Sequence, residues 1–180
     1  MEYLYYPGCS LESSAKAYDE SLRAVFRGLG VQLTELDDWN CCGATMYMSV
    51  DETTSLAISA RNLALSGQHG KHDLVAPCSA CYTVLLKTNR FLRDGPELKE
   101  KVDQVLGGAG LKYDLTVAVR HPLDVLVNDI GIDVIERAAK RRLDGISFAP
   151  YYGCQIVRPE RGFDDCEFPL TMDQLFERLG

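Results

Sequence analysis

The sequence predicts an α/β protein with a mainly parallel sheet flanked by helices and a cysteine site at the carboxyl edge of the strands. Short apolar runs alternate with segments of helical periodicity along most of the 180 residues, which is typical of β-α-β crossovers. Several of these runs are followed directly by cysteines, at the edge where parallel sheets place their sites. The chain is 46% hydrophobic, so it can bury a core without metal or disulfide support.

The first predicted unit covers the amino-terminal 36 residues. Glu2 to Tyr6 is an aromatic and aliphatic run that favours a strand, and Cys9 lies just past it. From Ser13 the apolar positions recur at helical spacing until Gly30, where a helix would stop. Val31 to Leu36 then alternates like a second strand. A unit of this length is typical of a parallel crossover.

The later elements follow from the same periodicities. We expect a turn at Asp38 to Gly43, a helix around Thr53 to Leu65, a buried strand at Asp73 to Ala76, a helix after Ser79, a helix at Glu97 to Leu106, an apolar run leading into a helix within Val117 to Ile130, an amphipathic segment at Ile132 to Arg142 and a further strand at Ile146 to Pro150.

An internal sequence repeat predicts the domain organisation. Tyr5-Tyr6-Pro7-Gly8-Cys9 returns as Tyr151-Tyr152-Gly153-Cys154, each time after an apolar run, which suggests a duplicated module. We therefore expect one complete cysteine-rich module at residues 1–145 and the start of a second, incomplete module at residues 146–180.

Charge and hydropathy exclude two classes of partner. The net charge is -7, and the basic residues are scattered apart from the run Lys140 to Arg142, so we expect no nucleic-acid partner. No apolar stretch approaches the roughly 20 residues of a membrane span, and the amino terminus lacks the features of a signal peptide. The sequence predicts a cytoplasmic protein.

Cysteine content carries the functional interpretation. Seven cysteines in a reducing compartment point to metal or redox chemistry. Five of them form a pattern at predicted sheet edges: Cys9, Cys41, Cys42, Cys78 and Cys81. A zinc ion or an ordinary cubane cluster takes four ligands. A fifth cysteine, with two of the five adjacent, therefore favours an irregular multi-iron cluster, with zinc as a possible substitute.

Alternatives remain open for the other candidates. Cys154 is a possible ligand of the incomplete second site, and burial as a small hydrophobe is the more common role for a cysteine such as Cys166. His121 lies between a predicted strand and helix, where it is either a proton donor near the sheet edge or a structural histidine, the more common case. A non-catalytic docking module, stabilised by zinc on Cys9, one of Cys41 or Cys42, Cys78 and Cys81, is the competing hypothesis.

The chain resembles the cysteine-rich CCG domain family, and as a whole it is similar to the amino-terminal part of the B-type subunit of heterodisulfide reductase. The resemblance is carried by Tyr5 to Cys9, Cys41-Cys42-Gly43, Cys78-Ser79-Ala80-Cys81, His121 to Asp129 and Tyr151 to Pro159.

This resemblance implies an oxidoreductase subunit with a noncubane [4Fe-4S] cluster on the five cysteines. It also implies a disulfide substrate and a ferredoxin-like, electron-donating partner subunit in a reductase complex. Relatives carry two CCG modules, so we expect this chain alone to lack full turnover. The CCG subunits of lactate, glycolate and fumarate oxidoreductases share the five-cysteine motif and are the alternative identity.

Overall fold

The computed structural model describes residues 1–44, 47–70, 73–158 and 162–180. Its strands form one sheet in the order β2-β1-β3-β4, and every pairing is parallel. The strands are β1 (Glu2–Tyr5), β2 (Gln32–Glu35), β3 (Leu74–Val75) and β4 (Val119–Arg120). The predicted α/β class and parallel sheet are therefore confirmed.

Helices follow each strand. They are α1 (Gly8–Leu11), α2 (Lys16–Gly28), α3 (Tyr47–Val50), α4 (Glu52–Gln68), α5 (Ser79–Asp94), α6 (Pro96–Gly108), α7 (Pro122–Asp124), the π-helix η1 (Val125–Gly131), α8 (Ile132–Ala138), α9 (Cys154–Val157) and α10 (Thr171–Leu179). No helix in the described ranges has the length and apolar character that crossing a membrane requires.

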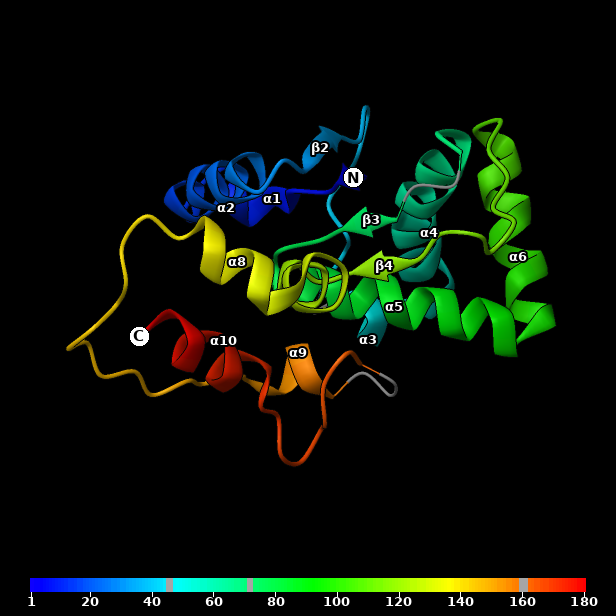
Figure 1. Ribbon diagram of the computed structural model, residues 1–180. Helices are drawn as coiled ribbons and strands as arrows, with labels where there is room; N and C mark the ends of the chain where they lie inside the picture. Colours follow the sequence, from blue (N-terminus) through cyan, green and yellow to red (C-terminus); the bar gives the residue numbers. More distant parts are fainter. Residues whose placement is uncertain (45–46, 71–72, 159–161) are drawn as a thin grey trace.

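Alternation along β1 builds a core on each face of the sheet. Tyr3 and Tyr5 belong to a cluster with Phe26 of α2, whereas Leu4 and Tyr6 belong to a cluster with residues of α4, α5 and α6. Successive side chains of a strand point to opposite faces, so one four-residue strand anchors both layers. Figure 1 shows α2 on one side of the sheet and α4 to α6 on the other.

The strand order places a topological switch point beside β1. From β1 the chain crosses to β2 at one edge, and from β3 it crosses to β4 at the other edge. The connections that leave the adjacent strands β1 and β3 therefore diverge. In open α/β sheets this topological switch point, at the carboxyl ends of the strands, is where ligands bind.

One predicted element is wrong. Ile146 to Pro150 forms no strand in the structure. Ile146 is 54% exposed and Phe148 is 42% exposed, so this run does not enter the sheet core that would have made it a strand. Phe148 instead stacks on Phe176 of α10, with ring centroids 4.4 Å apart.

The first helix also differs from the prediction. Residues 8–11 form the separate short helix α1, and α2 begins only after Ala15, which makes no side-chain cap. A helix continuous from Ser13 is therefore not observed. Gly30 ends the helical region as predicted, with a positive φ of 72°.

The carboxyl-terminal segment packs against the first part of the chain. Thr83 of α5 donates a hydrogen bond of 2.6 Å to the carbonyl of Gln155. Ile156, Leu175 and Leu123 belong to a third apolar cluster. Figure 1 shows α9 and α10, in orange and red, on the side of α5 and α8 that faces away from the strands.

Candidate functional site

Three segments carry the five cysteines, and each of them follows the carboxyl end of a strand. Cys9 lies in α1 directly after β1, and Cys41 and Cys42 lie in the loop after β2. Cys78 is the N-cap residue of α5, and Cys81 lies in the first turn of that helix. The predicted carboxyl-edge location of these cysteines therefore agrees with the fold.

The five thiols lie near one another, and two pairs of sulfur atoms are in contact. The Sγ atoms of Cys9 and Cys41 are 3.9 Å apart, and those of Cys42 and Cys81 are 3.5 Å apart. Cys41 also affects the pKa of Cys42, and Cys81 affects the pKa of Cys78. Residues far apart in the sequence thus meet through their thiols.

Burial varies across the group. Cys42 and Cys81 are buried, Cys78 is half-buried, and Cys9 and Cys41 are exposed. The site is therefore closed at one end and open to solvent at the end formed by Cys9 and Cys41. Within the described ranges, no three His, Cys, Asp or Glu side chains are arranged around a position for a single metal ion.

The surroundings favour thiolates at two positions. The Cys81 side chain, and then the backbone N–H groups of Cys81 and Ala80, lower the pKa of Cys78 to about 5, against the opposing effect of burial. The contact with the Cys81 sulfur, at 3.5 Å, also lowers the pKa of Cys42. The same two contacts raise the pKa of Cys81, which keeps its proton. Thiolates at a helix N-terminus are the form that binds metal.

A glycine and a tyrosine shape the buried end. A Cβ atom at Gly8 would lie 2.9 Å from the Cys81 sulfur, and Gly8 has a positive φ of 71°. Tyr6 is fully buried, packs edge-on against Trp39, and donates a 2.7 Å hydrogen bond to the Asn40 carbonyl. Its pKa is raised by burial and then by the neighbouring thiols, so its hydroxyl stays protonated.

Asn40 fixes the turn before Cys41, and the sequence interpretation missed it. Its backbone N–H donates to Asn62 Oδ1 at 2.9 Å, and its carbonyl accepts from Asn62 Nδ2 at 3.0 Å. Its own Nδ2 donates to the carbonyls of Cys41 and Ile58. A polar Asn62 within the apolar run of α4 is the signal that points to this contact.

His121 is buried, at 5% exposed, and its ring contacts the backbone of the helix that follows it. Nδ1 accepts from the backbone N–H of Leu123 at 3.2 Å. Burial lowers the pKa of His121 to about 4. The ring is neutral at physiological pH, which favours the structural interpretation over that of a proton donor.

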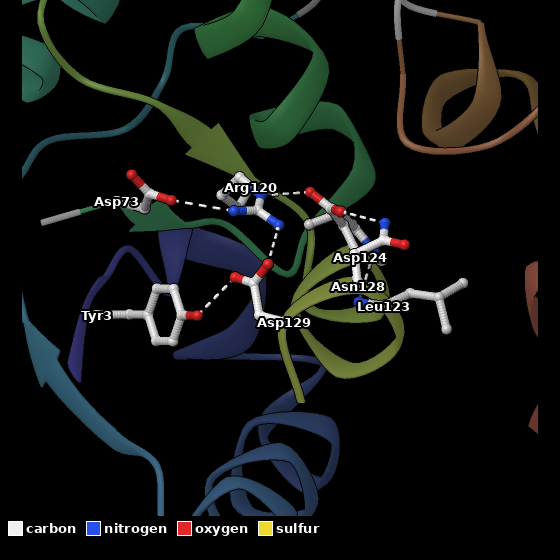
Figure 2. Close-up of polar contacts among 8 residues, drawn as sticks. Tyr3, Asp73, Arg120, Leu123, Asp124, Asn128 and Asp129 are labelled. Carbon is white, nitrogen blue, oxygen red and sulfur yellow. Dashed lines mark hydrogen bonds and ion pairs between the residues drawn. The ribbon is translucent and has the colours of Figure 1, made fainter. Parts of the chain in front are cut away.

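An ionic network holds the segment that follows β4. Figure 2 shows Arg120 at the centre of three carboxylates. It is 3.0 Å from Asp73 and from Asp129 and also forms an ion pair with Asp124. Tyr3 of β1 donates a 2.6 Å hydrogen bond to Asp129. The network ties the helical segment after His121 to β1, β3 and β4.

The remaining cysteines lie apart from the group of five. Cys154 and Cys166 are both exposed, and in the described part of the chain no sulfur contact joins them to the other five. Exposure makes Cys166 differ from the buried small hydrophobe that was expected. Cys154 begins α9 directly after Gly153, whose φ of 69° matches the 71° of Gly8 before Cys9. The similarity between the segments that lead into Cys9 and Cys154 thus extends from the sequence to the backbone conformation of the glycine.

The donor set fits an iron–sulfur group. All five convergent atoms are sulfur, the ligand that such clusters use. Gly8 leaves open the space that a Cβ would fill beside Cys81. Cys78 is the N-cap residue of α5, and backbone N–H groups at such a helix start are groups that tune cluster potential.

Comparison with known proteins agrees with this geometry. Residues 3–86 match the family described as the cysteine-rich domain, CCG. The chain is 32% identical, over all of its length, to an Archaeoglobus profundus protein that is named as similar to the B-type subunit of heterodisulfide reductase. It is 30% identical over 96% of its length to the B-type subunit of the ferredoxin/F420H2-dependent CoB-CoM heterodisulfide reductase of Methanosarcina acetivorans.

A third relative is named for a different activity. The 8-methylmenaquinol:fumarate reductase membrane anchor subunit of Wolinella succinogenes is 30% identical over 99% of the chain. The chain spans 62% of the length of the Archaeoglobus and Wolinella proteins and 58% of the Methanosarcina protein.

Proposed function

We propose that this chain is an iron–sulfur redox subunit that holds a noncubane [4Fe-4S] cluster. The premise is the match of residues 3–86 to the cysteine-rich CCG domain. The proposed ligands are Cys9, Cys41, Cys42, Cys78 and Cys81. When bound, the cluster supplies one-electron transfer at a sulfur-rich centre. The observation that carries the proposal is that three segments at the carboxyl edge of the sheet bring sulfur atoms into contact, Cys9 with Cys41 and Cys42 with Cys81, with Cys78 beside Cys81 in the first turn of α5. In this proposal residues 1–145 are the complete module, and Cys154 opens a second.

The protein's own groups have separate tasks at this site. The Cys78 and Cys42 thiols have lowered pKa values, chiefly through the neighbouring Cys81 side chain, which favours the thiolate form that binds metal. Tyr6 and Trp39 pack together beside the buried end and exclude water there. The exposed pair Cys9 and Cys41 forms the open end, where a substrate or an electron-donating subunit can approach.

The reaction we propose is reduction of a disulfide. Cleavage of one disulfide consumes two electrons and two protons and releases two thiols. The electrons come from a ferredoxin-like partner subunit of a cytoplasmic complex. Support comes from the Archaeoglobus and Methanosarcina relatives, whose names are those of heterodisulfide reductase subunits.

A stoichiometric experiment tests this reaction without requiring turnover. Iron-loaded protein is reduced anaerobically with a viologen, freed of excess reductant and mixed with an alkyl disulfide. We expect the protein to be reoxidised, with one thiol released per chain, because two chains together supply the two electrons. Cys42→Ser should accept no electron from the viologen, whereas Cys166→Ser should match the wild type. Protein that stays reduced in the presence of the disulfide would contradict the proposal.

A second candidate is a CCG subunit that serves fumarate reduction. It is favoured by the 30% identity to the Wolinella subunit over 99% of the chain, a similarity as high as that to the Methanosarcina protein. The same reduced protein, mixed with a menaquinone analogue in place of the disulfide, separates the two. Reoxidation by the quinone alone would favour this second candidate.

A further inference from the structure

Asn40, the residue before the two adjacent cysteines, has a partner for each of its polar groups. Its backbone N–H and carbonyl both bond Asn62 of α4, and its Nδ2 donates to the carbonyls of Cys41 and Ile58 at 2.8 and 3.0 Å. The remaining group, Oδ1, accepts from Nη1 of Arg61 at 3.0 Å. One turn of α4 therefore holds Asn40 at its backbone and at both ends of its side-chain amide.

Arg61 and the Cys41 carbonyl together fix the orientation of the Asn40 amide. A guanidinium has N–H donors and no acceptor, so the amide atom beside Arg61 must be the oxygen. The amide nitrogen then faces the Cys41 carbonyl, which can only accept. A continuous line of hydrogen bonds therefore runs from the Arg61 guanidinium, through one amide, to the backbone of Cys41.

The same guanidinium also holds the backbone two residues before Asn40. Asp38 has a positive φ of 55°, a left-handed conformation that is unfavourable for a residue with a Cβ. Nη1 of Arg61 donates to the Asp38 carbonyl at 2.6 Å, and Nη2 pairs with the Asp38 carboxylate. The Asp38 side chain is 76% exposed, so solvent weakens this ion pair. The contacts with the Asp38 carbonyl and with Asn40 are therefore the ones that define the loop.

We propose that Arg61 is a positioning residue for Cys41, acting through the Asn40 amide and the Asp38 carbonyl to fix the loop that carries the adjacent cysteines. The inference rests on the proposed function, because it assigns a role toward the same cluster site. Without Arg61 the Asn40 amide loses the donor that orients it, and the exposed Cys41 end of the site is free to move.

Two substitutions separate the contacts of Arg61. Arg61→Ala removes its contacts with both Asp38 and Asn40. Asp38→Gly removes only the exposed carboxylate, keeps the carbonyl, and suits the positive φ at this position. The electron paramagnetic resonance spectrum and the iron retention of iron-loaded protein should change in Arg61→Ala and stay close to wild type in Asp38→Gly. Equal changes in both variants, or none in Arg61→Ala, would overturn the inference.

Trp39 provides a readout that needs no metal. It is the only tryptophan in the sequence, it lies between Asp38 and Asn40, and its ring packs edge-on against Tyr6 at 5.3 Å. In metal-free Arg61→Ala we expect the Trp39 fluorescence emission to shift to longer wavelength, because the released loop exposes the indole to water. The emission of Asp38→Gly should match that of wild type.

Hydrogen–deuterium exchange of the same metal-free proteins separates a local effect from a global one. The peptide that covers residues 38–44 should exchange several-fold faster in Arg61→Ala than in wild type or Asp38→Gly. The helix α2, on the other face of the sheet, is the internal control and should exchange at the wild-type rate. Wild-type exchange of residues 38–44 in Arg61→Ala, or equal acceleration of α2, would reject positioning, even if wild-type protein bound no iron and the proposed function itself failed.

Discussion

Gly8 and Cys81 lie so close that a single Cβ at position 8 would come within 2.9 Å of the Cys81 sulfur. Gly8 stands between β1 and Cys9, and Cys81 stands on the first turn of α5. The backbone of one cysteine loop therefore sets the position of a sulfur from another. This contact makes the approach of the two loops dependent on one glycine.

Gly8→Ala should destabilise the protein and prevent cluster assembly. The new methyl group meets Cys81, and the φ of 71° is strained by about 1–2 kcal/mol for an L-residue. Gly30→Ala is the matched control, because Gly30 has a φ of 72° and nothing within 4 Å of an added Cβ. We expect the control to lose stability but retain iron. Urea unfolding and iron analysis measure the two effects, and equal iron loss in both variants would contradict the contact.

Asn62→Ala should loosen the turn that carries Cys41 and Cys42. Asn62 is fully buried and makes both backbone hydrogen bonds to Asn40. Leaving a buried backbone group without its partner costs about 1–3 kcal/mol, and we expect a loss of that order in the free energy of unfolding. Ser66→Ala is the control, since Ser66 only donates to a carbonyl of its own helix. The idea fails if both variants unfold at the same denaturant concentration.

The ion pairs of Arg120 should contribute more to the free energy of unfolding than ion pairs on the protein surface. Arg120→Ala leaves the carboxylates of Asp73, Asp124 and Asp129 near one another without the cation that pairs with all three. Removing one partner of a buried pair costs about 3–5 kcal/mol; for this partly exposed network we expect about 2–3 kcal/mol. Arg178→Ala, which removes a side chain that is 49% exposed in its ion pairs, should lower the stability much less, because solvent screens exposed pairs. Thermal unfolding of both variants makes the comparison.

Stability should fall as the pH drops from 6.5 to 4, and His121 should account for part of that fall. Burial lowers its pKa from 6.5 to about 4, against the opposing charge of Asp124. Within this window the unfolded chain binds a proton that the folded chain refuses, so folding weakens as acid is added. The shift corresponds to about 3 kcal/mol at most. His121→Gln should show a flatter stability profile over this range. Parallel profiles would exclude the buried neutral ring.

Much of the fold and of the candidate site could be predicted because the signals are local. The alternation of buried and exposed side chains in Glu2–Tyr5 and the helical spacing of apolar residues in Lys16–Gly28 are visible in each segment alone. Each segment needs only to turn one apolar face toward the core. The cysteine spacing indicated a shared edge because parallel strands end together. The order β2-β1-β3-β4 depends on pairings distant in sequence, so the switch point beside β1 was not predicted.

The errors have a physical cause. Ile146 to Pro150 has the apolar composition of a strand, but composition does not reveal whether a neighbouring strand is available to pair with it. Phe148 packs on Phe176 instead. The role of Asn40 depends on Asn62, 22 residues further on, which local periodicity does not detect.

The most direct test of the account is the metal content of anaerobically purified protein, measured with Cys42→Ser and Cys166→Ser in parallel. We expect about four iron and four acid-labile sulfide per chain in wild type, as a [4Fe-4S] cluster requires. Cys166→Ser should be the same, and Cys42→Ser should lose the native cluster. One zinc per chain without sulfide, or full iron content in Cys42→Ser, would contradict a cluster held by five cysteines.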